Sequence, residues 1–277
     1  MVKNIISYIL SFIMVALIIA IVAVSFLQNK VLNEDYWKMQ MEQNNYYEKL
    51  EDTVNDGFEN YIMQSGMDSS VFEGIYDLDK VKEDTNSIVH AILNNEEFKI
   101  DTSTIREKLD NNIRKYIKDN KVLVNKTTEN QIQNFENAII NSYSNSVSYS
   151  NSIVKTVSSI TGKVKNIIPK IFIIVVILLI VNIVALITLN IKNIRNVLKL
   201  IAIIAFTIAG LSILGRILEK HFLGIQSLTV LNENISVIVQ IFVKEIYGIL
   251  YMTTVVGTAL GVIFSAICGN KTKNIVN

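Results

Sequence analysis

Long apolar stretches and one large polar block alternate along this chain. Four stretches are almost wholly apolar, and each approaches the ~20 residues that an α-helix needs to cross the hydrocarbon core of a bilayer. They cover residues 4–27, 169–189, 197–215 and 246–268. The polar block, residues 28–167, repeats apolar positions at three- and four-residue steps, as amphipathic helices do. The pattern predicts an all-α integral membrane protein with four transmembrane helices and a helical-bundle domain inserted between the first and the second.

The same pattern predicts the order of segments. We expect an N-terminus with the first span (1–27), the helical domain (28–167), the second span (168–190), a short loop (191–196), the third span (197–215), a longer loop (216–245), the fourth span (246–268) and a tail (269–277). The first apolar run is longer than the about 7–15 residues of a signal-peptide core. We therefore expect an uncleaved signal anchor; cleavage after the small residues Ala23 and Ser25 is the alternative.

The longer loop contains an unusual apolar segment, residues 222–243, which is interrupted by Asn232, Glu233 and Asn234. Placing these polar side chains in hydrocarbon would be costly. We therefore expect an interfacial or re-entrant segment, with a helix from about Asn234 running into the fourth span. A fifth span is the alternative, and it would move the C-terminus to the outer side.

The distribution of positive charge predicts the orientation. Short loops rich in lysine and arginine stay in the cytoplasm, whereas long translocated domains are exempt from this rule. The relevant residues are Lys3, Lys192, Arg195, Lys199, Lys271 and Lys273. All of them fall on one side of a four-span protein. We therefore expect a multi-pass protein of the cell membrane with both termini in the cytoplasm and residues 28–167 extracytoplasmic.

Composition and charge narrow the class further. Half of the residues are hydrophobic and the mean hydropathy is +0.36, which is too apolar for a soluble protein of 277 residues. Residues 28–167 contain 16 lysines and arginines against 22 acidic residues, a net charge of −6. Nucleic acid is therefore not an expected partner, because phosphate binding needs a clustered basic surface. The abundance of isoleucine, asparagine and lysine is typical of bacteria with AT-rich genomes.

The polar block predicts two long helices with two or three shorter ones between them. The expected helix starts are Asn33, Asp68 or Ser69, Asp79, Thr102 or Ser103, and the capping-box sequence Thr128-Glu129-Asn130-Gln131. The first long helix is expected to reach about Gln64 and to stop at Gly66. The last is expected to loosen at Thr161 and Gly162. Pro169 then fits the first turn of the second span, where a missing N–H costs little.

This layout resembles the four-helix extracytoplasmic sensor domains of bacterial chemoreceptors. The chain departs from that pattern after the second span, where further membrane spans replace a long cytoplasmic signalling region. No functional residue is therefore carried over from those receptors.

Small residues recur every four positions in the fourth span. The stripe consists of Thr253, Gly257, Gly261, Ser265 and Gly269. Such a stripe allows another helix to approach closely. We expect it to pack against a span of the same chain, with Ala205, Ala209 and Ser212 as one facing surface; a second subunit or a pore is the alternative. Asn182, in the second span, is expected to form an interhelical hydrogen bond, with a substrate or ion contact as the alternative.

The aromatic residues of the first outer helix are a further candidate site. Trp37 is close enough to the first span to lie at the membrane interface. Tyr46 and Tyr47 fit the domain core. Together with Trp37, they are also the residues most suited to anchor a partner.

The sequence contains no recognisable catalytic or metal-binding pattern. His90 and His221 have no ligand-spaced partners, and the single cysteine, Cys268, excludes a disulfide framework. The acidic group at residues 77–84 lacks the spacing of a calcium loop. No phosphate-binding loop, nucleophile elbow or zinc-protease motif occurs. We therefore expect no cofactor and no enzymatic activity.

These observations lead to one expected function and two alternatives. We expect a non-enzymatic accessory or sensor subunit whose extracytoplasmic domain binds a partner protein, an envelope component or a small ligand, and which acts through another membrane protein. The first alternative is a channel or transporter component that forms homo-oligomers through the small-residue stripe. The second is an envelope enzyme centred on His90 or on the acidic group at residues 77–84.

Overall fold

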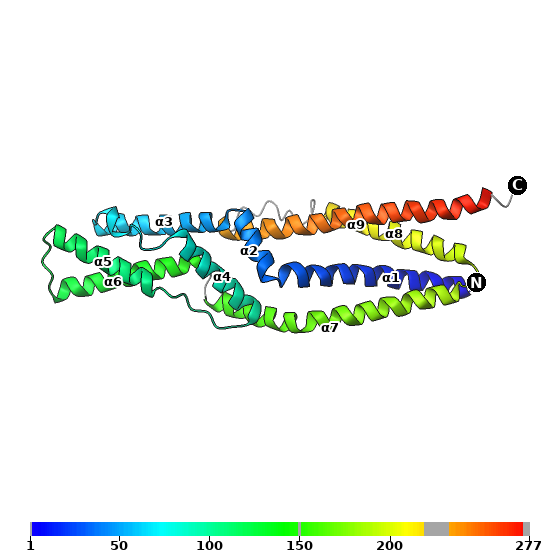
Figure 1. Cartoon of the computed structure of the whole chain (residues 1–277), viewed down its shortest axis with the longest axis horizontal. Helices are drawn as coiled ribbons and strands as arrows, with labels where there is room; N and C mark the ends of the chain where they lie inside the picture. Colours follow the sequence, from blue (N-terminus) through cyan, green and yellow to red (C-terminus); the bar gives the residue numbers. More distant parts are fainter. Residues whose placement is uncertain (1, 149–150, 219–232, 274–277) are drawn as a thin grey trace. The chain divides into compact units, whose positions relative to one another are not determined.

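The structure is a computed structural model that describes residues 2–148, 151–218 and 233–273 (Figure 1). All regular elements in these ranges are helices. Four of them are long and apolar enough to cross a membrane: Val2–Val31, Thr156–Leu189, Ile194–Leu218 and Ser236–Gly269. For the described residues this confirms the expected all-helical architecture with four helices that are candidates to span a membrane.

The chain divides into two compact units. Unit 1 comprises Met1–Lys30 and Asn166–Asn277, and unit 2 comprises Val31–Lys165. Unit 2 falls within the polar block, residues 28–167. Each unit has its own packing and is described separately.

Unit 1 contains the apolar helices. They are α1 (Val2–Phe26), continued by a π-helical turn (Leu27–Val31), the apolar part of α7 (Asn151–Leu189), α8 (Ile194–Leu218) and α9 (Glu233–Lys273). A buried cluster of Met14, Val15, Leu186, Leu200 and Ile204 joins α1, α7 and α8. The most extensive helix pair in the unit is α8 with α9. Helix α9 begins at Glu233, beside the expected start at Asn234; residues 219–232, with His221 and the first part of the segment 222–243, lie outside the described residues.

Unit 2 is a bundle of amphipathic helices. It comprises α2 (Glu34–Gln43), α3 (Tyr46–Ser65), a 3-10 turn (Ser69–Val71), α4 (Leu78–Asn94), α5 (Ser103–Asp119), α6 (Lys126–Val147) and the first turns of α7. Helix α3 packs on α6 and α4, and α5 packs on α6. The apolar core is well buried, with Leu50, Val54, Val81, Leu109, Ile113 and Ile139 at most 1% exposed. Burial of these side chains is the main favourable term for the bundle.

The expectation of a single long helix from Asn33 to Gln64 is wrong, because the helix is interrupted at Asn44 and Asn45. Asn45 adopts a left-handed backbone conformation with φ of 52°. The side-chain amide of Asn44 donates to the carbonyl oxygen of Gln40 at 2.7 Å. Asparagine tolerates the left-handed region and competes with the helix for backbone hydrogen bonds, so two in succession end α2.

Two expected helix caps are displaced towards the N-terminus. Asp77, and not Asp79, caps α4 by accepting from the backbone N–H of Lys80 at 2.9 Å. Asn125 caps α6 by accepting from the N–H groups of Thr127 and Thr128, so the capping box expected at Thr128 is wrong. In both places an earlier Asx residue with extended backbone satisfies the free donors first.

The expectation that one long helix ends the polar block is also wrong. Helix α6 ends at Val147, and Ser148 has an extended backbone. Helix α7 then runs from Asn151 to Leu189 through both Gly162 and Pro169. Gly162 does not loosen the helix: a Cβ built at this position would lie 2.5 Å from the Cβ of Asn95. Glycine is therefore needed here for the close approach of α7 to the end of α4.

Candidate functional site

The small-residue stripe of α9 faces α8 of the same chain. A Cβ added at Gly257 would lie 2.8 Å from the carbonyl oxygen of Ala205, and one at Gly261 would lie 2.8 Å from the ring of Phe206. The hydroxyl groups of Thr253 and Ser212 are hydrogen-bonded at 2.7 Å. Ser265 and Gly269, at the end of the stripe, line a groove instead. The two helices thus use the glycines for close contact within the chain.

Asn182 does not make the expected interhelical hydrogen bond. Its side chain is 7% exposed, and its Oδ1 has no hydrogen-bond partner within the described residues. The interhelical amide bond instead involves Asn190, which donates from Nδ2 to Ser7 Oγ of α1 at 3.0 Å. Asn196 donates to Asn190 Oδ1 at 2.6 Å and completes this network. Asn190 was not singled out from the sequence because it directly follows the apolar stretch 169–189, at the end of the expected second span.

The aromatic residues proposed as partner-facing are buried. Trp37, Tyr46 and Tyr47 are 8%, 3% and 2% exposed. The indole of Trp37 donates to the carbonyl oxygen of Val31 at 2.9 Å, and the hydroxyl of Tyr47 donates to Asn86 Oδ1 at 2.7 Å. The expectation that Tyr46 and Tyr47 belong to the domain core agrees with this burial, and the three rings expose little surface to a partner.

His90 and the acidic group lie at different places in unit 2. His90 Nδ1 lies 2.7 Å from Glu34 Oε2 on the exposed surface. Asp77 is the helix cap described above, whereas Asp84 is 4% exposed and lies in the core. Within the described residues no three His, Cys, Asp or Glu side chains are grouped so as to hold a metal ion.

Asp84 is the centre of a buried polar network. Its Oδ1 accepts from Lys80 Nζ at 2.8 Å, and its Oδ2 accepts from the hydroxyl of Tyr143 at 2.8 Å. Burial raises the pKa of Asp84 above its ordinary value, and the hydrogen bonds from Lys80 and Tyr143 oppose that shift. Burial likewise raises the pKa of Tyr143. The network joins α4 to α6.

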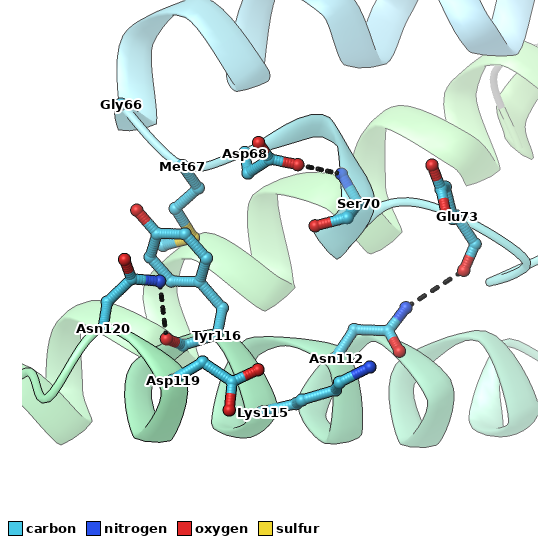
Figure 2. Close-up of a pocket in the computed structure, with 10 residues that line it drawn as sticks. All are labelled: Gly66, Met67, Asp68, Ser70, Glu73, Asn112, Lys115, Tyr116, Asp119 and Asn120. Atoms are coloured by element: carbon cyan, nitrogen blue, oxygen red, sulfur yellow. Dashed lines mark hydrogen bonds between the residues drawn. The ribbon is translucent and has the colours of Figure 1, made fainter.

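An open polar pocket, here called the tip pocket, lies where α3 ends and α5 ends (Figure 2). Its volume is about 760 Å³. The lining residues are Gly66, Met67, Asp68, Ser70, Glu73, Asn112, Lys115, Tyr116, Asp119 and Asn120. One side is formed by the loop from Gly66 to Glu73 and the other by the last turns of α5 (Figure 2). No other described pocket has a mainly polar lining.

Local backbone chemistry holds the loop in place. Gly66 terminates α3 with φ of +66°, a conformation that favours glycine. Asp68 Oδ1 then accepts from the N–H of Ser70 at 2.9 Å, which starts the 3-10 turn. Asn112 of α5 donates to the carbonyl oxygens of Val71 and Glu73 at 3.1 and 3.0 Å. One amide side chain thus ties the loop to the helix on the opposite side of the pocket.

The lining carries more negative than positive charge. Asp68, Glu73 and Asp119 supply three carboxylates, and Lys115 supplies one ammonium group. The hydrogen bond from the Ser70 backbone holds the pKa of Asp68 below its usual range, so this carboxylate is ionised at neutral pH. The ring of Tyr116 adds an aromatic surface. Carboxylates beside an aromatic ring suit a cationic or amino-bearing ligand.

Sequence reasoning did not identify this pocket. One signal was present: Asn112, Lys115, Tyr116 and Asp119 follow the helical spacing i, i+3, i+4 and i+7, which places them on one face of α5. The apolar face of the same helix was recognised, whereas its polar face had no marker that distinguished it from a solvated surface.

Asn112→Ala is expected to detach the loop. Two hydrogen bonds to the carbonyl oxygens of Val71 and Glu73 are lost, at about 1 kcal/mol each. The free energy of unfolding of unit 2 should fall by about 1–2 kcal/mol, and amide hydrogen exchange should accelerate in residues 67–76. Asn111→Ala, on the exposed side of the same helix, is the control. Equal exchange in the two variants would show that Asn112 does not hold the loop.

Comparison with known protein families, with curated proteins and with solved structures finds no match to this chain.

Proposed function

We propose that this chain is a non-enzymatic membrane protein whose unit 2 is an extracytoplasmic recognition module, acting as an accessory or sensor subunit of another membrane protein. The observation that carries the proposal is the tip pocket, a hollow with a polar lining that is fixed to the bundle by Asn112. The four apolar helices of unit 1 would anchor this module in the bilayer. The orientation follows from the positive-inside distribution of lysine and arginine.

The proposed ligand is a small organic molecule with a cationic nitrogen. Three carboxylates and one ammonium group give the lining a net negative charge. Asp119 and Tyr116 lie on successive turns of α5, so a carboxylate and a ring are available to the same cation. The volume, about 760 Å³, is within the usual range for small-molecule sites.

A binding experiment tests the proposal on the full chain in nanodiscs. Choline is the cationic probe and citrate the anionic one, and binding is followed by isothermal titration calorimetry. Asp119→Asn and Glu73→Gln should each weaken choline binding roughly fivefold, as loss of one exposed charge contact predicts. Glu107→Gln removes an exposed carboxylate of α5 that does not line the pocket, and it should leave binding unchanged. Stronger binding of citrate, or equal loss in all three variants, would refute a cation site.

The channel alternative now has less support. Gly257 and Gly261, which suggested a subunit contact, approach α8 of the same chain. Purification of the full chain from its native membrane, with a mass measurement of the complex, separates the two proposals. A stoichiometric second membrane protein supports the accessory subunit, and a pure homo-oligomer supports the pore.

A further inference from the structure

A second hollow, here called the α8–α9 groove, lies at the N-terminal end of α8 and the C-terminal part of α9. Its volume is about 470 Å³. From α8 it is lined by Arg195, Lys199, Ala202 and Phe206, and from α9 by Ser265 and Cys268. All of these residues belong to unit 1. Arg195 and Lys199 are among the residues whose positive charge predicts the orientation of the chain.

The groove is cationic at one end and apolar at the other. Arg195 and Lys199 are four residues apart, so they lie on one face of α8 in its first two turns. Ala202 and Phe206 continue the same face further into the helix. Within the described residues, no carboxylate lies within ion-pair distance of Arg195 or Lys199. Both positive charges are therefore available to an anion.

The groove also lies at the expected depth for a lipid headgroup. The membrane-spanning part of α8 begins at Ile194, and that of α9 ends at Gly269. The thiol of Cys268 lies 3.7 Å from the carbonyl oxygen of Arg195, which places these two ends at the same level. If these helices span the bilayer over these ranges, the cationic end of the groove is at the bilayer surface and the apolar end is in the hydrocarbon.

The end of the groove at Gly269 is open, and a contact at Phe206 closes the opposite end. A Cβ added at Gly269 would meet no atom within 4 Å. Deeper in the membrane, the ring of Phe206 lies against Gly261 and fills the space between the helices. The groove is therefore unobstructed at Gly269, and Phe206 lies at its other end.

We propose that the α8–α9 groove binds one anionic phospholipid. The phosphate group lies between the Arg195 guanidinium and the Lys199 ammonium, and the first part of an acyl chain follows Ala202 to Phe206. Basic pockets between transmembrane helices recognise anionic headgroups in this way. The apolar half of the groove selects a lipid over free phosphate. The proposal is independent of what unit 2 binds.

Native mass spectrometry of the purified full chain tests this proposal. The protein is titrated with phosphatidylglycerol or phosphatidylcholine in detergent, and the bound lipid is counted. We expect one phosphatidylglycerol per chain, bound at least tenfold more tightly than phosphatidylcholine. Arg195→Gln with Lys199→Gln should remove this preference. Glycerol 3-phosphate, which has the headgroup chemistry without acyl chains, should not compete at equal concentration.

Matched controls distinguish a specific lipid-binding site from a general effect of positive charge. Lys192→Gln removes a positive charge from the same short segment, outside the groove, and should retain the preference for phosphatidylglycerol. Ser265→Phe keeps both cations and fills the apolar half, and should weaken phosphatidylglycerol binding. Lys199→Gln alone, at an exposed position, replaces the double variant if that variant fails to fold. Equal affinity for the two lipids, or equal losses in Lys192→Gln and Lys199→Gln, would overturn the proposal.

Discussion

Gly257→Ala is expected to destabilise the membrane part of the protein by about 1–3 kcal/mol, which is the usual cost of adding a methyl group to a packed interior. The added Cβ would lie 2.8 Å from the carbonyl oxygen of Ala205 and 3.2 Å from the backbone nitrogen of Ala209. Neither backbone atom can move without shifting α8. The two helices must separate, which also weakens the hydrogen bond between Ser212 and Thr253.

The measurement is SDS-induced unfolding of the full chain in mixed micelles, followed by circular dichroism. Gly248→Ala is the control, because it lies on the same helix and an added Cβ there meets no atom within 4 Å. It should leave the unfolding midpoint unchanged or raise it slightly, since alanine is the better helix former. Equal destabilisation by the two substitutions would show that helix contact is not the reason for glycine at position 257.

The second large effect is expected for Tyr143→Phe, which should lower the free energy of unfolding of unit 2 by about 2–3 kcal/mol. The phenol hydroxyl donates to Asp84 Oδ2 in the core, and its removal leaves a buried carboxylate oxygen without that donor. An unsatisfied buried acceptor costs about 1–3 kcal/mol, and charged groups cost more. Lys80 still binds the other carboxylate oxygen and limits the loss.

Fluorescence of Trp37 reports this change without a label, because it is the only tryptophan and it is buried in unit 2. Tyr47→Phe is the matched control: it removes a hydroxyl from an equally buried ring, but the acceptor is the neutral amide of Asn86. We expect about 0.5–1.5 kcal/mol for that change. Combining Tyr143→Phe with Asp84→Leu should recover part of the stability. A larger loss in Tyr47→Phe than in Tyr143→Phe would contradict the role given to Asp84.

The elements that could be predicted are those in which one physical signal dominates. Hydropathy alone identifies the four apolar helices, because a bilayer leaves a chain few other solutions. The apolar stripes of α3 and α5 likewise lead to buried residues such as Leu50 and Leu109. Helix propensity does not predict the interruption at Asn45, because a single asparagine is only weakly unfavourable in a helix. The helix ends here because Asn44 and Asn45 act together.

The tip pocket was harder to predict than any helix. Asp68 and Glu73 are separated from Asp119 by more than 40 positions, and only the hydrogen bonds of Asn112 bring the two segments together. The environment of Trp37 and Tyr47 could not be predicted for a different reason. A large aromatic ring on an amphipathic helix fits a core and a binding surface equally well until its neighbours are known.

The hydroxyl groups of α1 have a consequence for biosynthesis. Ser7 donates to the carbonyl oxygen of Lys3 at 3.0 Å, and Ser11 donates to that of Ser7 at 2.9 Å. Asn190, which later donates to Ser7, and the core residue Leu200 of α8 are translated only after the whole of unit 2. During that interval α1 lacks these final neighbours. Because Ser7 and Ser11 donate within their own helix, neither hydroxyl has to wait for a partner from a later helix.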